Sequence, residues 1–568
     1  MRDKLVYHCW QNHAIRYPGN EAIVHWDALG EPFRWTYGSL LDVSDTIACS
    51  LIRSGIETGD VCALILRHNK FFYPTYLAIA AIGAIPAVLA YPNARLHPDK
   101  FVHGMSGMLE RSGLDWILTE KDLAPVIDPL TAAGQNRIKG ILFPLEWTGS
   151  ARTGNRNSLP IGKRRDTLDN ASPFLLQHSS GTTGLQKAVV MSNKAILDHV
   201  NNYSAAIGLS QHDKVVNWLP LYHDMGLIAA FILPLAFGIP SIQLDPFQWV
   251  TAPSILLHAV TREKATLAWM PNFAYVFLAD RIPDDELDGV DLSSIRMLIN
   301  SSEVVRGESH EKFFNRFVKY GFRRSALSTC YAMAEATFAV TQTPPGSDAV
   351  SLAVDSQALA KRKVLPARGV GPSKLCVSSG KPIPGCSVKI SDKDGTEMPD
   401  DRIGTVLIRS DSLFDGYMND PEKTRLSKRD GWYISGDLGF IHDGECFVIG
   451  REDDVIINAG RNIFPEDVED AVNTVPGVIP GRVVAFGVED AATGTEKVCL
   501  AAETPYLTEK EKEALKLAVK IAGMAVDVTI QEVYLVPPRW LIKSSSGKPS
   551  RKTNMARILS GDITRGGT

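Results

Sequence analysis

The chain alternates helical segments with short apolar runs over most of its length. Up to about Gly450, a segment with helical spacing is repeatedly followed by an apolar run, as in 36–55 and 61–66, 195–208 and 214–220, and 254–264 and 265–271. Consecutive strands that are joined through helices usually run parallel in one sheet. The alternation therefore predicts layered α/β architecture built on a largely parallel sheet.

The pattern changes after Cys386. Segments 386–410 and 439–453 resemble antiparallel hairpins, with Asp394-Gly395 and Asp443-Gly444 as turn dipeptides. A short α+β stretch follows Arg451 and includes a charged helix over 508–523. Because 568 residues are too many for one core, we expect a large N-terminal domain, 1–450, of α/β subdomains with a small β-barrel-like part. A small α+β C-terminal domain, 451–568, is expected to follow.

Composition excludes some classes of function. Sixty basic and 64 acidic residues leave a net charge of −4, so the composition lacks the excess of basic residues that is typical of nucleic-acid-binding proteins. The eight cysteines are scattered without a C-x-x-C pair, which favours reduced thiols over disulfides or a zinc site. The first 18 residues lack the apolar core of a signal peptide. We therefore expect a cytoplasmic protein.

One apolar run, Phe71 to Pro92, is nearly long enough to span a lipid bilayer. Gly83 and Pro86 interrupt it, and its second half has the character of a short strand. A buried helix followed by a buried parallel strand explains the run better than a membrane span does. We expect no membrane span.

The sequence HSSGTTGLQK, His178 to Lys187, combines hydroxyls, glycines and a lysine. Gly181 and Gly184 allow backbone N–H groups to approach an anion closely. Lys187 adds a positive charge, and hydroxyl donors come from Ser179, Ser180, Thr182 and Thr183. The segment lacks the spacing of a P-loop. It predicts a phosphate-binding loop, although a polar surface loop has the same composition.

Other segments carry chemistry suited to a nucleotide. In TCYAMAEAT, Glu335 follows Tyr331, and a carboxylate can bind Mg²⁺ while an aromatic ring can stack on a base. Asp437 lies in a glycine turn suited to ribose hydroxyls, Arg451 is the second residue of GREDD, and Lys548 lies in KSSSGKPSRK. Each segment alone also fits an ordinary helix carboxylate, hairpin turn, charge run or basic tail.

The order of these segments resembles the acyl-adenylate-forming superfamily, which includes acyl-CoA synthetases and fatty acyl-AMP ligases. The resemblance covers about 35–551 and rests on HSSGTTGLQK, WLPLYHDMGL, YAMAEAT, SGDLGFI, GREDDVIINAGRNIFP and SSSGK. It implies a ligase that uses ATP and Mg²⁺ to convert a carboxylic acid to acyl-AMP, releases pyrophosphate, and then transfers the acyl group to a thiol. It also implies that the C-terminal domain is mobile.

Within the superfamily, the chain is most similar to the fatty acyl-AMP ligases. Segment 218–228 has their Tyr-His-Asp-Met-Gly form, 245–275 resembles their acyl-pocket segment, and 351–385 resembles their insertion. The resemblance implies a medium- or long-chain fatty acid as substrate, in fatty acid metabolism or in lipid or polyketide biosynthesis. The implied acyl acceptor is the phosphopantetheine thiol of a carrier protein.

The resemblance also implies roles for single residues. Lys548 bridges the carboxylate and the α-phosphate, His223 lies at the acyl end, and Glu335, with Thr182, binds Mg²⁺. Asp453 is the hinge of the small domain. The phosphates, the ribose and the adenine are contacted by Ser179, Ser180, Gly181, Thr182, Thr183, Gly184, Lys187, Ser301, Ser302, Glu303, Tyr331, Ala332, Asp437 and Arg451.

Some positions depart from the family pattern and leave alternatives open. Asp453 is the residue often found in acyl-CoA ligases, where fatty acyl-AMP ligases often carry Lys, so transfer to CoA is the second hypothesis. Ser301-Ser302 stands in place of Gly-Ala, and Ala332 in place of Gly. These changes near the adenine motivate a third hypothesis, a non-adenylating protein that binds acyl-AMP. The insertion favours the carrier protein, because in that group it restrains the domain rotation that CoA transfer needs.

Overall fold

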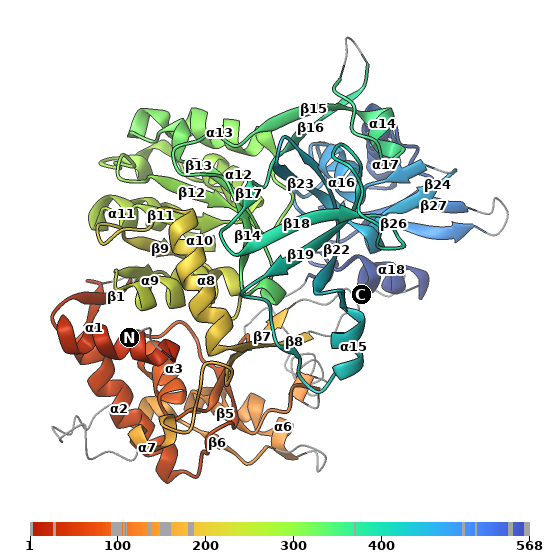
Figure 1. Ribbon diagram of the computed structural model, residues 1–568. Helices are drawn as coiled ribbons and strands as arrows, with labels where there is room; N and C mark the ends of the chain where they lie inside the picture. Colours follow the sequence, from red (N-terminus) through yellow and green to blue (C-terminus); the bar gives the residue numbers. More distant parts are fainter. Residues whose placement is uncertain are drawn as a thin grey trace.

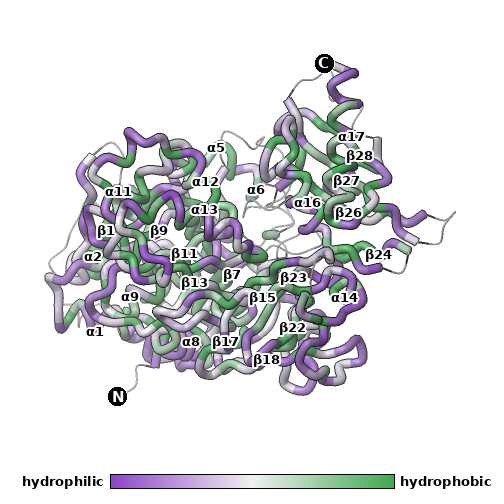
Figure 2. Tube along the Cα trace, turned by 90° about the horizontal axis from the view of Figure 1, so that it is seen from above, coloured by the Kyte–Doolittle hydropathy of each residue, from purple (hydrophilic) through white to green (hydrophobic). Residues whose placement is uncertain are grey.

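The computed structural model in Figure 1 describes most of the chain. The described residues are 4–26, 30–92, 105, 108–109, 111–132, 138–147, 161–179, 187–367, 371–459, 461–490, 495–505, 508–543 and 549–561. We refer to residues up to Gly450 as the N-terminal part and to those from Arg451 onwards as the C-terminal part. Figure 2 shows α16, α17 and β26–β28 of the C-terminal part gathered at one side of the molecule.

A nine-stranded sheet forms the centre of the N-terminal part. Its strands lie in the order β17-β14-β13-β12-β11-β9-β10-β1-β2, and the six from β13 to β1 run parallel, with antiparallel strands at both edges. This arrangement confirms the predicted parallel sheet. In that order, the strands are Lys381–Pro382, Ala339–Gln342, Leu327–Ala332, Met297–Asn300, Leu267–Met270, Val215–Asn217, Ser241–Gln243, Glu21–His25 and Phe33–Thr36.

The predicted helix–strand pairs are confirmed. Helix α2 precedes β3, α8 precedes β9, and α11 precedes β11. Side chains at the helix starts fix the boundaries: Thr36 and Ser39 form a capping box on α2, and Ser192 accepts a hydrogen bond from the backbone of Ala195 in α8. The helices around the sheet include α1 (Val6–Arg16), α2 (Tyr37–Arg53), α8 (Asn193–Ala206), α9 (Leu233–Phe237), α10 (Pro246–Thr251), α11 (Ser254–Glu263), α12 (Asn272–Arg281) and α13 (Gly307–Phe317).

A second, four-stranded parallel sheet has the order β4-β3-β5-β6. Its strands are Ile85–Val88, Val61–Ile65, Trp116–Thr119 and Gly140–Leu142. Every residue of α3 (Phe72–Ala81) is buried, and β4 follows it directly into the sheet. The apolar run that starts at Phe71 is therefore a core helix and a core strand, as predicted.

Among the described residues, no helix has the length and apolar character required to cross a lipid bilayer.

Antiparallel strands follow the main sheet, as predicted. They lie in the order β18-β19-β22-β21, with β23 paired to β22, and they are Cys386–Ser391, Gly404–Ser410, Trp432–His442, Lys428–Arg429 and Glu445–Arg451. Asp443 and Gly444 both have positive φ, 49° and 74°, which fits the expected two-residue turn. In the first hairpin, Asp394-Gly395 lies inside the bridge between Ser391 and Glu397. The loop then continues to Gly404, so this connection is longer than a simple turn.

The C-terminal part has its own core. Strands β26 (Val483–Asp490), β27 (Thr495–Glu503) and β28 (Glu532–Val536) form one sheet, which packs with α16 (Pro465–Asn473) and α17 (Glu509–Ala525). The predicted charged helix is α17, and Thr508 and Glu511 form its capping box. Helix α18 (Arg551–Leu559) contributes to a second cluster. The core side chains include Ile463, Val468, Val472, Val483, Leu500, Leu515 and Val519.

The segment predicted as an insertion forms an antiparallel pair, β15 (Ser351–Asp355) and β16 (Ser373–Val377), with α14 (Ser356–Ala360) between them. Val354, Leu359 and Cys376 belong to one buried cluster with Phe464 of the C-terminal part. The insertion therefore packs between the two parts of the chain.

Candidate active site

Four neighbouring parallel strands lead into the predicted site. Strands β9, β11, β12 and β13 lie next to one another in the main sheet. Strands β9, β11 and β12 are followed by segments 218–224, 271–275 and 301–303, and β13 ends within segment 331–335. Because the carboxyl ends of parallel strands share one edge, sequence segments far apart meet there. This edge is the usual position of a ligand site in α/β proteins.

The predicted phosphate-binding loop connects two antiparallel strands. Strand β7 (Pro173–Ser179) pairs with β8 (Lys187–Ser192), and Ser179 lies opposite Lys187 in the register. The side chain of Ser179 and the residues Ser180, Gly181, Thr182, Thr183 and Gly184 lie outside the described residues. Phosphate binding by these residues remains a prediction.

Lys187 and Glu335 lie close to each other at the start of β8. The Lys187 Nζ atom is 3.9 Å from Glu335 Oε1, and the Tyr417 hydroxyl donates a 2.8 Å hydrogen bond to the same oxygen. Burial lowers the pKa of Lys187, and the charge of Glu335 opposes this shift. Glu335 comes from the 3-10 turn η8 (Ala334–Ala336), and Tyr417 from the short strand β20 (Gly416–Tyr417). A buried carboxylate thus lies beside Lys187, the last residue of the predicted phosphate-binding segment.

The two residues predicted to hold the ribose lie next to each other. Asp437 on β22 is opposite Arg451 on β23, and Arg451 Nε is 3.1 Å from Asp437 Oδ1. The carboxylate of Asp437 raises the pKa of Arg451. Tyr331, near the end of β13, donates a 2.5 Å hydrogen bond from its hydroxyl to Asp437 Oδ2. The predicted adenine and ribose residues therefore form one hydrogen-bonded group.

The loop after β12 contacts both acyl-side segments. Glu303 Oε2 accepts a 3.1 Å hydrogen bond from the backbone of Phe273, and the Ser302 hydroxyl lies 3.9 Å from Met225 Sδ as a hydrogen-bond donor. Ser301 is buried, and its backbone N–H donates to the carbonyl of Met270. Ser302 has a φ of 72°, a strained conformation for a residue with a side chain. Ala332 is the last residue of β13.

His223 precedes an unusual helix. Its Nδ1 atom is 3.1 Å from Asp224 Oδ1, and the same oxygen accepts a hydrogen bond from the backbone of Met225. Met225–Ile232 form η4, a π-helix of eight residues that are all buried. Helices of this type often occur at functional sites. Gln177 on β7 donates a 3.0 Å hydrogen bond to the carbonyl of Tyr222, which joins this segment to the strand leading into the phosphate loop.

Aromatic side chains gather on the predicted acyl-pocket segment. The rings of Trp218 and Trp249 are stacked with centroids 3.5 Å apart, and Phe273 contacts both rings edge-on. Phe277 packs against Trp249 at 5.1 Å. Phe273 is 45% exposed, so this cluster reaches the protein surface beside the loop that holds Glu303.

The predicted hinge lies next to the segment that carries Lys548. Asp453 belongs to the 3-10 turn η9 (Glu452–Asp454), and its Oδ2 is 3.5 Å from Lys552 Nζ. Arg551 forms ion pairs with Asp454 at 2.7 Å and Glu469 at 2.8 Å. Lys548 lies outside the described residues, so its role remains a prediction.

The predicted phosphate-binding segment begins at His178 and no predicted segment includes Tyr417, yet it is Tyr417 that contacts the predicted site residues. His178 is buried and its Nε2 is 2.8 Å from the Ser112 hydroxyl. Burial lowers the pKa of His178 to about 4, so the ring is neutral at pH 7. Tyr417 contacts both Glu335 and Lys187, yet it belongs to none of the segments predicted to bind ATP.

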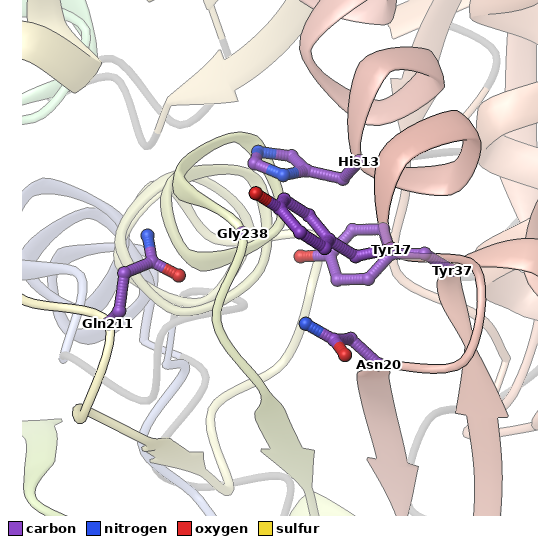
Figure 3. Close-up of a pocket in the computed structure, with 6 residues that line it drawn as sticks. All are labelled: His13, Tyr17, Asn20, Tyr37, Gln211 and Gly238. Carbon is purple, nitrogen blue, oxygen red and sulfur yellow. The ribbon is translucent and has the colours of Figure 1, made fainter.

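A separate surface hollow lies between α1, the start of α2 and the end of α9. It has a volume of about 340 Å³, and Figure 3 shows the rings of His13, Tyr17 and Tyr37 around it. Asn20, Gln211 and Gly238 complete its lining. It contains no acidic or lysine side chain and none of the predicted site residues, so we do not assign it to ATP.

In the described part of the chain, no group of three or more His, Cys, Asp and Glu residues is arranged to hold a metal. Mg²⁺ usually binds to one or two carboxylates together with substrate phosphates. Glu335, which lies beside Lys187, fits this mode of binding.

Comparison with known proteins finds a matching family and several relatives. Residues 10–418 match the AMP-binding enzyme family. A medium-chain fatty acid–[acyl-carrier-protein] ligase of Moorena producens is 31% identical over 404 residues, covering 68% of each chain. A 4-hydroxyphenylalkanoate adenylyltransferase of Mycobacterium tuberculosis is 27% identical and covers 90% of this chain and 84% of that protein.

A solved structure extends the comparison. The fatty acyl-adenylate ligase of Legionella pneumophila, in complex with acyl adenylate and pyrophosphate, has a TM-score of 0.73 at 26% identity and covers 98% of this chain and 96% of that chain. The chain belongs to the AMP-binding enzyme family. It is a ligase of that family, and the α/β fold class predicted from the sequence is confirmed.

Proposed function

We propose that the protein activates a medium- or long-chain fatty acid with ATP to give acyl-AMP and pyrophosphate. The observation that carries this proposal is the convergence of Lys187 and Glu335 with the Tyr331–Asp437–Arg451 group at one edge of the main sheet. Similarity to the fatty acyl ligases of Moorena producens and Legionella pneumophila supports the substrate class.

The residue types fit the chemistry. A fatty acid carboxylate oxygen attacks the α-phosphorus of ATP, the bond to the bridging oxygen of pyrophosphate breaks, and an acyl phosphate anhydride forms. Two anions must approach each other, so positive charge has to be supplied at the site. We assign Lys187 to the β- and γ-phosphates and Lys548 to the carboxylate and the α-phosphate. Mg²⁺ bound by Glu335 would offset charge on the triphosphate.

We assign the remaining predicted residues by their position. Asp437 and Arg451 would hold the ribose, Tyr331 the adenine, and the loop 301–303 the other side of the base. His223, which lies just before η4, would be at the acyl end, and the aromatic cluster of Trp218, Trp249 and Phe273 would contribute to the acyl pocket. We further propose that 1–450 and 451–568 are the two domains and that the second turns about Asp453.

We propose a carrier-protein pantetheine thiol as the acyl acceptor. The insertion supports this choice, because Lys374 of β16 binds Asp467 of α16 at 2.6 Å and Asn462 donates to the carbonyl of Ala360 in α14. These contacts hold the C-terminal part against the N-terminal part. Asp453 favours the alternative, transfer to CoA, and a fatty-acid–CoA ligase name is carried by a Mycobacterium tuberculosis relative, 27% identical over 95% of this chain.

The acceptor is tested by intact-mass analysis of the reaction products. The protein is incubated with ATP, Mg²⁺ and a panel of fatty acids, with CoA alone or with a pantetheinylated carrier protein alone. Acylated carrier without acyl-CoA is the expected result. Acyl-CoA as the main product would establish the CoA-ligase alternative. Absence of acyl-AMP and pyrophosphate with every acid would favour the third hypothesis, a non-adenylating acyl-AMP-binding protein.

A further inference from the structure

Arg306 lies at the junction between the two parts of the chain. It precedes α13 and follows the loop 301–305, and its side chain is only 19% exposed. The guanidinium forms an ion pair with Asp470 and lies 3.5 Å from Asp467, both on α16 of the C-terminal part. Arg306 therefore reaches from the end of the predicted adenine-side loop into the C-terminal part.

The backbone of Arg306 is fixed to the acyl side of the site. Its N–H donates a 3.0 Å hydrogen bond to Asn272 Oδ1, and Asn300 Nδ2 donates to the same oxygen at 3.1 Å. Asn272 begins α12, and the next residue, Phe273, is bound by Glu303. The loop 301–306 is thus held at both ends to the start of α12, while its last side chain binds α16.

The contacts made by Arg306 and by the insertion share Asp467, which Lys374 of the insertion binds at 2.6 Å and Arg306 approaches to 3.5 Å. Arg306 alone of these two cations is paired with Asp470. Lys374 and Arg306 are both mostly buried, at 14% and 19% side-chain exposure, so solvent screens these charges less than it screens a surface pair. Loss of Arg306 would leave the insertion contact in place.

We propose that Arg306 is a positioning residue that couples occupancy of the acyl-AMP site to the placement of the C-terminal part. The inference rests on the proposed function. Acyl-AMP bound against the loop 301–303 and α12 acts on the segment that fixes Arg306, and through Arg306 on Asp470. Because coupling between two events is reciprocal, loosening of α16 must also change the affinity for acyl-AMP.

The test uses hydrogen–deuterium exchange of the full-length protein. Exchange in α16 (465–473) is measured with and without a non-hydrolysable acyl sulfamate of adenosine, and the affinity for that analogue is measured in parallel. In the wild type, the analogue is expected to change exchange in α16. In Arg306→Gln, this change should disappear, and the affinity should shift on the order of fivefold or more, the lower end of typical coupling.

Further variants separate coupling from a folding defect. The charge exchange of Arg306→Asp with Asp470→Arg should restore the response of α16, while each single substitution should abolish it. Lys312 lies on α13, the helix that follows Arg306, and forms an exposed ion pair with Asp280 of α12; Lys312→Gln removes this pair and should behave as wild type. Arg306→Lys keeps the positive charge, so it should retain part of the α16 response that Arg306→Gln loses.

The outcomes of this test distinguish the coupling role of Arg306 from the proposed function. A full wild-type response in Arg306→Gln, with unchanged affinity, would overturn the coupling role and leave the proposed function intact. Failure of the wild type to bind the analogue would overturn the proposed function and this inference with it.

Discussion

The hydroxyl of Tyr417 donates a 2.8 Å hydrogen bond to Glu335 Oε1, the oxygen that lies 3.9 Å from Lys187 Nζ. The two residues are 82 positions apart in the chain. Tyr417 reaches Glu335 because β20 pairs with β8, the strand that begins at Lys187. The contact orients the carboxylate that we assign to Mg²⁺, since a hydrogen bond to one oxygen fixes the direction of the other.

Removal of this hydrogen bond should slow adenylation. We expect Tyr417→Phe to lower the rate of pyrophosphate release on the order of tenfold, and Glu335→Gln to lower it a hundredfold or more, because preorganised charge at the transition state is lost. Stopped-flow detection of pyrophosphate measures both rates. Tyr534→Phe, which removes a hydroxyl bound to Glu532 in the C-terminal part, is the matched control. Equal effects of the two tyrosine substitutions would contradict the role of Tyr417.

Asp437 should determine the affinity for ATP. Asp437→Asn weakens the ion pair with Arg451 and the hydrogen bond from Tyr331. The KM for ATP should therefore rise about tenfold to a hundredfold, which corresponds to the free energy of roughly one hydrogen bond to a charged group. The KM for the fatty acid should change little. Steady-state kinetics with each substrate varied in turn provides the measurement. A rise in the KM for the acid alone would show that Asp437 acts on the acid and not on ATP.

The sequence predicts which residues form the site better than it predicts which residues contact one another there. Lys187, Glu335, Asp437 and Arg451 are recognisable because their spacing to glycines and aromatics is local, and the structure brings them together. Tyr417 comes from a two-residue strand with no periodicity of its own, so its partner could not be predicted. The same holds for Arg306 and Asp470, which are far apart in the sequence and meet only where the residue before α13 reaches α16 in the folded chain.

The burial of a side chain is a second property that could not be predicted from the local sequence pattern. His178 begins the hydroxyl- and glycine-rich segment, but its ring is buried beside Ser112, because both faces of β7 are covered and residues 174–178 are all buried. The parallel sheet and the hairpins were predictable, since they follow from periodicity and turn dipeptides.

Gly226 should tolerate no side chain. A Cβ atom at this position would lie 2.4 Å from the carbonyl oxygen of Pro220, and this backbone atom cannot move without displacing His223 and η4. We expect Gly226→Ala to lower the apparent melting temperature by several degrees, as overpacking typically costs about 1–3 kcal/mol. Gly162→Ala has no atom within 4 Å of its Cβ and should be neutral. Equal melting temperatures for the two variants would refute the close approach.

His178 should make the protein less stable in acid. Burial lowers its folded-state pKa from 6.5 to about 4, so between these pH values the unfolded chain binds a proton that the folded chain does not. Stability therefore falls as pH decreases through this window, by up to about 3 kcal/mol from this residue.

The control for this effect is a histidine at the surface. Denaturation with urea at pH 7 and pH 5 should show a smaller acid loss in His178→Gln than in the wild type. His212→Gln, at an exposed position, should leave the acid loss unchanged. An unaltered pH dependence in His178→Gln would show that the ring is not buried in its neutral form.

The most direct test of the central claim is ATP–pyrophosphate exchange driven by a fatty acid. Purified protein is mixed with ATP, Mg²⁺, labelled pyrophosphate and fatty acids of increasing chain length, without any thiol acceptor. Incorporation of label into ATP that requires the acid, and that is lost in Lys548→Ala and Glu335→Gln, is the predicted result. Absence of exchange with every acid, or exchange of equal rate in Glu335→Gln, would contradict acyl-adenylate formation at this site.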